Sequence, residues 1–250
     1  MPILRFIALL CLAGGMSFPA YSDSNLIQLS QSPKWRALLH YKAQGLNNVE
    51  YSEVDDARFF LSKAGKYDPL AELKATVTAF QQQAEGDEAA VCRFPARLNW
   101  LQTVLPEKNF TTIACPAYDD WYEKVQGDAL FLIFPSSYIN SPSSMFGHTL
   151  FRLDGKQGHQ LLSSAINFAA FTDANDDELT FTVKGLTGGY PGYVSLVPYY
   201  EKVNEYNHIE SRDIWEYELK LNHDQIQEFT RHIWELNEIR FDYFFIDENC

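Results

Sequence analysis

Two side chains in this sequence are suited to covalent catalysis: the imidazole of His148 and the thiol of Cys250. A cysteine nucleophile attacks as a thiolate, so it needs a base that accepts its proton, a group that orients the base and donors for the oxyanion. His148 follows Gly147 at the start of a β-rich run, where a side chain can face a cleft. A single histidine or cysteine more often has a structural role, so the assignment of His148 and Cys250 as a catalytic pair is a hypothesis.

The group that orients the imidazole is expected on the next strand. Residues 154–158 (DGKQG) predict a hairpin whose symmetry places Ser164 opposite His148, with both side chains on one face. His159, at the start of the second strand, is an alternative orienter. Ser164 can equally be an ordinary sheet residue.

Further segments predict the elements that position these residues. Strand patterns occur at residues 129–134, 148–153, 160–166, 194–197, 215–221 and 241–246. Asn222 with Gln225 indicates a capping box before an amphipathic helix. Upstream, residues 32–105 show helical patterns, and Asp68 before Pro69 is typical of a helix start. The pattern predicts an α+β protein with a helical N-terminal region.

Glycines and tyrosines occur together in residues 185–192, and Tyr193 follows. Glycine permits close approach of a ligand, and tyrosine offers a flat contact surface. We interpret this segment as a loop that covers a substrate, with a tight connection as the alternative.

The N-terminus has the pattern of a cleaved secretory signal over residues 1–22. Arg5 precedes an apolar run too short to span a bilayer, and Ala20 and Ser22 fit the cleavage rule. We therefore expect export across the inner membrane and a mature chain that begins at Asp23.

Export places the remaining cysteines in an oxidising compartment, where paired thiols persist. Cys92 and Cys115 flank one segment, and each is followed closely by a proline. We expect these two to form a disulfide and to leave Cys250 as the unpaired thiol.

The composition excludes some partners. The chain has 250 residues, of which 20 are Lys or Arg and 33 are Asp or Glu, which gives a formal net charge of -13. Because no basic run offsets this charge, we expect no nucleic-acid partner. No cluster has the spacing of a metal site and no glycine motif for phosphate is present, so we expect neither metal nor cofactor.

A series of motifs in fixed order resembles the Lnb N-terminal periplasmic domain family. These motifs are Cys92-Arg93-Phe94-Pro95-Ala96-Arg97, Ser141-Pro142-Ser143-Ser144-Met145-Phe146-Gly147-His148-Thr149, Gly188-Gly189-Tyr190-Pro191-Gly192, Ser211-Arg212-Asp213-Ile214-Trp215-Glu216-Tyr217 and Asp247-Glu248-Asn249-Cys250. The resemblance runs from about Cys92 to the end. It divides the chain into a signal (1–22), a helical region (23–122) and the periplasmic domain (123–250).

The family in turn resembles circularly permuted papain-like enzymes of the NlpC type, in which the histidine strand precedes the cysteine helix. This resemblance implies an antiparallel sheet with packed helices, with Cys250 as nucleophile and His148 as general base. The same resemblance implies that the residue that orients the imidazole comes from the strand that holds Ser163, Ser164 and Asn167. Because that superfamily builds a helix from its cysteine onward, we expect a longer protein and an inactive 250-residue fragment.

The namesake of the family is a transacylase that moves an acyl chain within a lipoprotein, so the resemblance implies an acyl-bearing envelope substrate and a possible contact with the membrane surface. We assign Ser143, Ser144, Tyr190 and Tyr193 to substrate binding. Two alternatives remain: an inactive periplasmic binding or scaffold module that uses the same cleft, and a cell-wall peptidase or amidase.

Overall fold

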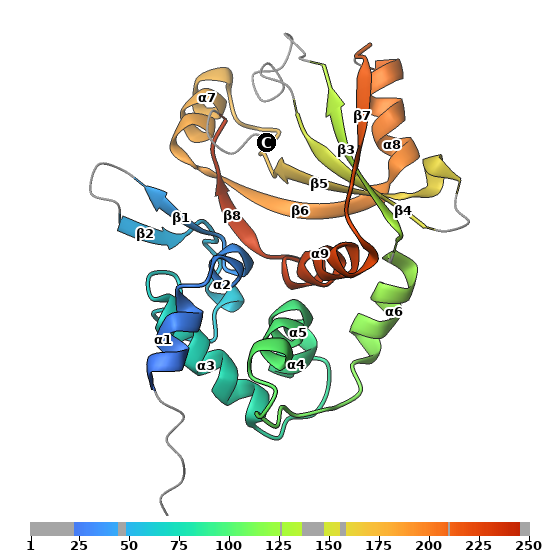
Figure 1. Ribbon diagram of the computed structural model, residues 1–250. Coiled ribbons are helices and arrows are strands. Elements are labelled where there is room, and N and C mark those ends of the chain that lie inside the picture. The colour runs from blue at the N-terminus through green and yellow to red at the C-terminus, as the bar shows by residue number, and fades with distance from the viewer. Residues whose placement is uncertain are drawn as a thin grey trace, which may run out of the picture.

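The computed structural model describes residues 23–44, 49–125, 127–136, 148–155, 159–209 and 211–245. The fold is α+β, as the sequence predicts, with helices at one end and a large antiparallel sheet at the other (Figure 1). The first part contains α1 (Asp23–Ser30), α2 (Pro33–Leu38), β1 (Tyr41–Gln44), β2 (Val49–Ser52), η1 (Ala57–Phe59), α3 (Pro69–Gln81), α4 (Ala90–Arg93), α5 (Pro95–Val104) and α6 (Pro116–Val125).

The large sheet has six strands in the order β7-β3-β4-β5-β6-β8, and every pair is antiparallel. Its elements are β3 (Ala129–Pro135), β4 (Leu150–Asp154), η2 (Gln160–Leu162), β5 (Ser164–Ala170), α7 (Glu178–Thr187), β6 (Tyr190–Pro198), α8 (Tyr199–Val203), η3 (Asn204–Ile209), β7 (Ile214–Leu219), α9 (His223–Glu235) and β8 (Arg240–Tyr243). The predicted strand near residues 241–246 is therefore in the same sheet as β4, with β5 and β6 between them.

The helix starts follow from their capping residues. The Asp68 carboxylate accepts hydrogen bonds from the backbone N–H groups of Leu70 and Ala71, at 3.0 and 2.9 Å. Asn222 and Gln225 form the predicted capping box at the start of α9. Both caps satisfy N–H groups that have no partner inside the helix, so these boundaries are readable from sequence.

The two faces of the sheet pack against different helices. On the α9 face, Leu130, Leu153 and Ile166 contact Ile226 and Ile233 of the helix. On the α8 face, Ile133, Leu150 and Ala165 contact Tyr199 and Tyr206. Helix α9 lies between the sheet and the N-terminal helices (Figure 1) and so forms the junction of the two parts.

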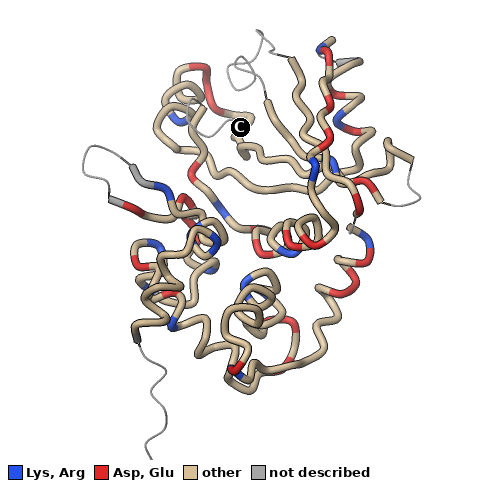
Figure 2. The backbone as a smooth tube through the Cα atoms, in the orientation of Figure 1, with Lys and Arg blue, Asp and Glu red and all other residues tan. Residues whose placement is uncertain are grey.

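Charged residues are distributed over the whole molecule and do not gather on one side of it (Figure 2). Figure 2 shows Asp and Glu on both the helical part and the sheet, while β5 and β6 carry no charged residue. Strands β5 and β6 can therefore be covered on both faces without burying ionised side chains of their own.

The predicted disulfide between Cys92 and Cys115 is present, with the two Cα atoms 5.4 Å apart. It joins α4 to the residue that precedes α6. Helix α6 in turn contacts α9 through the rings of Trp121 and Trp234, whose centroids are 5.3 Å apart. The disulfide therefore holds a helix that packs against the junction.

Replacing both cysteines, in Cys92→Ser with Cys115→Ser, is expected to lower the free energy of unfolding by about 3 kcal/mol, because the unfolded chain regains the entropy of an open loop. Denaturant unfolding of the variant and of the native protein measures the difference. An unchanged midpoint and slope would show that the disulfide contributes nothing to stability.

Two segments differ from the sequence prediction. The N-terminal region contains the β1–β2 hairpin as well as helices. The predicted loop at residues 185–192 is wrong, because α7 extends to Thr187 and β6 begins at Tyr190. Only Gly188 and Gly189 connect the two, and the positive φ of 74° at Gly188 ends the helix in a left-handed cap.

Candidate functional site

The imidazole of His148 lies in hydrogen-bond contact with the side chain of Asn167. The distance from His148 Nε2 to Asn167 Oδ1 is 2.6 Å. Because an amide oxygen can only accept, Nε2 carries the proton and donates it to this bond. The second ring nitrogen, Nδ1, then bears the lone pair. This arrangement fixes the tautomer that can accept a proton at Nδ1.

The strand register explains why Asn167 reaches His148. β4 and β5 pair Leu153 with Ser164 and Phe151 with Ile166. Continued by three residues, this register sets His148 opposite Ala169, which makes Asn167 its diagonal neighbour on the same face.

The predicted pairing of Ser164 with His148 is wrong. Ser164 is opposite Leu153. The turn η2 lies between the hairpin turn and the start of β5, so the connection has more residues on the β5 side than on the β4 side and is not symmetric. A register change by an odd number of residues exchanges the two faces. Ser164 therefore lies on the α9 face and Asn167 on the α8 face.

Burial is the main influence on the pKa of His148 and lowers it below the usual value. Lys202 and Arg212 lower this pKa further, while the hydrogen bond to Asn167 Oδ1 and the charge of Glu205 oppose the shift. The neutral imidazole is thus favoured near pH 7, which is the form that a general base requires.

Arg212 fixes the surroundings of this histidine. Its Nε donates to the backbone oxygen of Ser136, and Nη2 donates to that of Pro135 at 3.2 Å. Its backbone N–H donates to Tyr206 at 2.8 Å. Arg212 therefore joins the end of β3 to η3, and its charge acts on His148, which lies two residues before β4.

Tyr193 lies across the strand β5 from His148. It pairs with Ala169, the residue that the register sets opposite His148, and Ala169 is exposed. A small exposed residue thus separates the imidazole from a tyrosine ring on the α8 face.

Tyr190 has a different environment, because its separation of three residues from Tyr193 puts it on the other face of β6. It is 3% exposed, and its hydroxyl donates to Asp176 at 2.6 Å. Burial is the main influence on the pKa of Tyr190 and, with this hydrogen bond, raises it to about 12. Its contacts hold α7 against the sheet.

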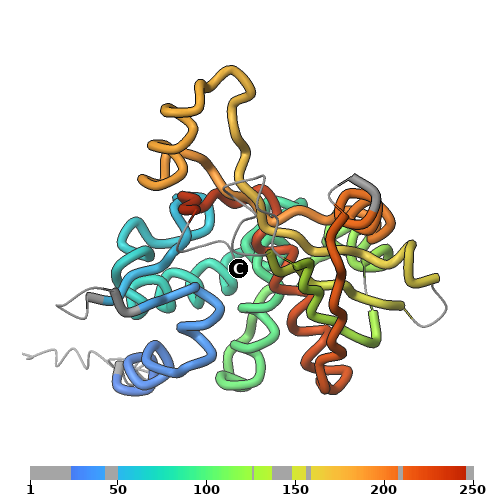
Figure 3. The backbone as a smooth tube through the Cα atoms, turned by 90° about the horizontal axis from the view of Figure 1, so that it is seen from above, coloured from blue at the N-terminus to red at the C-terminus, as the bar shows by residue number. Residues whose placement is uncertain are grey.

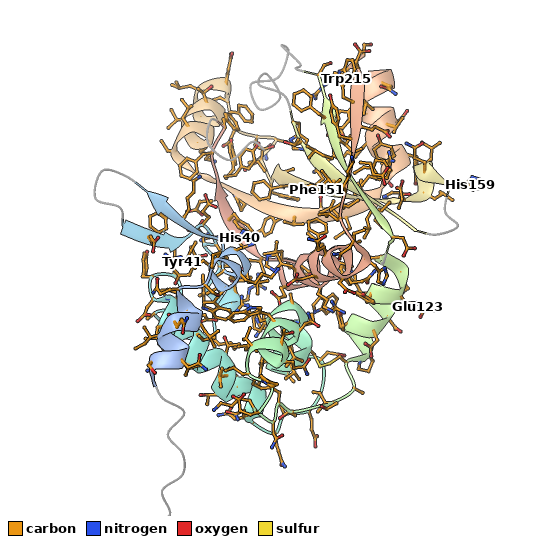
Figure 4. The ribbon with its side chains drawn as sticks, in the orientation of Figure 1. His40, Tyr41, Glu123, Phe151, His159 and Trp215 are labelled. Atoms are coloured by element: carbon orange, nitrogen blue, oxygen red, sulfur yellow. A yellow bond between two sulfur atoms is a disulfide. The ribbon has the colours of Figure 1, made fainter. Side chains whose placement is uncertain are left out.

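An apolar cavity of about 520 Å³ lies between the α9 face, α9 itself and the N-terminal part. Its apolar lining comprises Leu132, Leu150, Phe151, Ile166, Phe168, Val194, Phe229, Ile233, Leu236 and Phe241. Figure 4 shows Phe151 at the middle of the sheet, above α9. Thr149, which follows His148, and Asn167 also line the cavity, whereas the imidazole of His148 lies on the opposite, α8 face of the sheet.

Three predicted site residues, Cys250, Ser143 and Ser144, lie outside the described residues. His159, the alternative orienter, is exposed and sits at the outer side of the sheet, away from Phe151 (Figure 4). Of the candidate partners that the structure describes, Asn167 is the one that contacts His148.

A pair of histidines in the cavity wall, His40 and His232, could not be expected from the sequence. His40 Nε2 is 2.9 Å from His232 Nε2, and His232 Nδ1 is 3.1 Å from the carboxylate of Glu235. Burial, followed by the charge of His232 and then of Arg97, lowers the pKa of His40 to about 3, so this imidazole is neutral. His40 comes from the N-terminal part (Figure 4), and no spacing in the sequence links it to α9.

Within the described ranges, no group of three or more His, Cys, Asp or Glu side chains converges as a metal site. No helix in the same part of the chain combines the length and apolar composition needed to cross a membrane.

Comparison with known proteins gives two family matches. Residues 117–250 match the Lnb N-terminal periplasmic domain, and residues 27–104 match a domain of unknown function, DUF7843. No curated protein and no solved structure matches the chain. The first match covers more than half of the sequence. The chain belongs to the Lnb N-terminal periplasmic domain family.

Proposed function

We propose that the protein is a thiol-dependent acyl transferase or hydrolase of the cell envelope, with Cys250 as nucleophile and His148 as general base. The observation that carries this proposal is the 2.6 Å hydrogen bond from His148 Nε2 to Asn167 Oδ1. It leaves Nδ1 as a proton acceptor on a partly buried imidazole whose pKa is lowered.

The proposed reaction has two steps. In the first, His148 Nδ1 takes the proton of the Cys250 thiol, the sulfur attacks the acyl carbonyl carbon, and the proton then passes to the leaving group as its bond to carbon breaks. In the second, an amine or water attacks the thioester carbon and loses its proton to Nδ1, and this proton passes to the sulfur of Cys250 as the carbon–sulfur bond breaks. An amine acceptor gives acyl transfer, and water gives hydrolysis.

The acyl group of the substrate fits the apolar cavity, which is of a volume typical of ligand sites. The cavity reaches Thr149, the residue after His148, and the imidazole lies on the other face of the sheet, so the proposed acyl chain passes the end of β4 to place its carbonyl beside His148. Tyr193, which pairs with Ala169, is proposed to contact the leaving group of the acyl donor or the acceptor that replaces it. Ser143, Ser144 and Tyr190 remain proposed substrate-binding residues.

The family description supports a periplasmic location, which agrees with the signal predicted at residues 1–22. A location in the periplasm provides acyl-bearing lipids and lipoproteins as substrates. It also explains how the Cys92–Cys115 disulfide persists.

Labelling of the full-length protein with iodoacetamide tests whether Cys250 is an activated thiol. Cys11 lies in the predicted signal and Cys92 is paired with Cys115, so within residues 23–250 we expect alkylation at Cys250 alone, and none in Cys250→Ala. An acylating probe should give the same pattern. A thiol that reacts no faster than a free cysteine in solution would favour the binding-module alternative.

A further inference from the structure

A second cavity lies at the junction of the two parts of the chain. It has a volume of about 530 Å³, within the range typical of ligand sites, and is lined by residues of η1, α4, α6 and α9 and of the segments beside them. The indole N–H of Trp234, at the end of α9, donates to the carbonyl of Cys92 in α4 at 2.9 Å. Figure 3 shows α9 beside the N-terminal helices in the body of the molecule, away from the projecting segment that carries α7. We call this cavity the junction pocket.

Several charged groups in the wall of the junction pocket already have partners. The guanidinium of Arg58 donates to both carboxylate oxygens of Asp56, at 3.0 and 2.6 Å. Asp87 accepts a hydrogen bond from the N–H of Ala117 at 3.1 Å, and the buried Glu235 accepts one from a backbone N–H of α5 at 2.9 Å. These groups build the wall and are occupied within the protein.

Three other charged groups of the pocket are available to a ligand. Nη2 of Arg93 donates to the carbonyl of Arg58 at 2.6 Å, but no carboxylate in the described part of the chain pairs with this guanidinium. Glu88 and Glu238 are both exposed, and neither carboxylate has an ion pair or a hydrogen bond among the residues that the structure describes. The junction pocket therefore presents one cation and two anions to a ligand.

The backbone holds Glu238 in position. Its φ of 57° lies in the left-handed region, which residues other than glycine rarely adopt. Its carbonyl accepts a hydrogen bond from Arg58 Nη2 at 2.7 Å, and Arg58 is in turn bound to Asp56. The chain from which the Glu238 carboxylate projects is thus fixed before a ligand binds.

The apolar part of the wall is largely aromatic. Phe60, Phe94 and Trp234 line the pocket. The guanidinium carbon of Arg93 lies over the Phe94 ring, 5.0 Å from its centroid, which restricts the directions in which this cation can bind. An apolar side chain of a ligand can therefore contact the aromatic rings while a charged group of the same ligand binds Arg93.

The signs of the charges select the ligand. A simple anion bound to Arg93 would also meet the carboxylates of Glu88 and Glu238, and a simple cation would meet Arg93. A ligand that carries both charges avoids these repulsions. A guanidinium binds a carboxylate through two parallel hydrogen bonds, and an ammonium donates to carboxylate oxygens. A peptide with free ends has these two groups, and the exposed amide of Asn237 can bond to the peptide group between them.

We propose that the junction pocket binds a short peptide whose two ends are free. The peptide carboxylate binds Arg93, and its ammonium group binds Glu88 and Glu238. An apolar side chain of the peptide packs on the aromatic wall. This binding is independent of the acyl transfer proposed above, because His148 does not line the junction pocket.

Isothermal titration calorimetry of the full chain with the dipeptide alanyl-phenylalanine tests this site. We expect saturable binding of one dipeptide to the native protein. Amidation of the dipeptide carboxylate should weaken binding about tenfold or more, the effect of losing a charge-assisted hydrogen bond. Arg93→Gln should weaken binding of the free dipeptide to the same extent, and amidation should then have little further effect. Acetylation of the amine and the double variant Glu88→Gln with Glu238→Gln should behave as a second pair of this kind.

Two variants serve as controls. Lys124→Gln removes an exposed cation of α6 that does not line the pocket, and Cys250→Ala removes the proposed nucleophile. Both should bind the dipeptide as the native protein does. The comparison of the free and amidated dipeptides on the native protein needs no variant, so it decides the question even if Arg93→Gln does not fold.

The proposal is overturned if the native protein does not bind the free dipeptide, if amidation leaves the affinity unchanged, or if phosphoethanolamine binds and the dipeptide does not. Loss of binding in Cys250→Ala would place the peptide at the catalytic site and would also overturn it. An unreactive Cys250 together with intact dipeptide binding would count against the catalytic proposal and leave the junction pocket standing.

Discussion

Replacing Arg97 by alanine is expected to lower the free energy of unfolding by about 3–5 kcal/mol, the cost of breaking a buried ion pair. Arg97, Glu72 and Glu235 are buried, and the Arg97 guanidinium donates to Glu72 at 3.0 Å and to the Phe59 carbonyl at 2.9 Å. Its Nε lies 3.7 Å from Glu235. The variant would leave two carboxylates in the core without their cation. Denaturant unfolding measures the loss.

The matched control for this prediction is Arg240→Ala. The Arg240 guanidinium is 3.7 Å from Asp242, but the side chains of both residues are more than 40% exposed. An exposed pair of this kind contributes less than about 1 kcal/mol. Equal stability losses in the two variants would contradict the view that the Arg97 network joins the N-terminal part to α9.

Replacing His148 by alanine is expected to slow acyl-enzyme formation by about 10²–10⁴-fold, the contribution of a positioned general base. The reason is that an unassisted cysteine thiol, with a pKa of about 8.5, is mostly protonated near neutral pH. Single-turnover kinetics with an acylating probe measure the rate. His159→Ala, at an exposed histidine of the same sheet region, should retain the native rate.

The pH dependence provides a second measurement of the same histidine. Burial lowers the pKa of His148, so the neutral base persists below the usual histidine pKa of about 6.5. The rate should therefore fall on acidification with a midpoint below 6.5. A midpoint above 6.5, or an unchanged pH profile in His148→Ala, would exclude His148 as the base.

Much of the fold follows from local patterns in the sequence. Asp68 and Asn222 fix two helix starts because a cap depends on residues within one turn. β3 is recognisable from an uninterrupted apolar run, and β7 from alternation in the segment that includes Trp215 and Tyr217. The disulfide could be expected from the number of cysteines left after export.

The candidate site was predictable only in part, because its geometry depends on register. A symmetric turn predicts Ser164 opposite His148, but the η2 turn shifts the pairing by an odd number and exchanges the faces. Asn167 was among the residues expected on this strand from the family resemblance. Its contact with His148 could be identified only once the β4–β5 register was known.

Contacts between residues far apart in the sequence could not be predicted from its local patterns. His40 and His232 are 192 residues apart and meet only because α9 packs against the N-terminal part. The C-terminal part of helix α7 was missed for another reason. Glycines near residue 185 suggested a loop, whereas Gly185 is in fact a helical residue that makes room for the Phe245 ring.

The most direct test of the central claim is mass spectrometry of the full-length protein after a single turnover with an acyl donor. The account predicts an acyl thioester on Cys250 in the native protein, and little or none in His148→Ala when circular dichroism shows an unchanged fold. An adduct on a different residue, or undiminished acylation of Cys250 in His148→Ala, would contradict the Cys250–His148 mechanism.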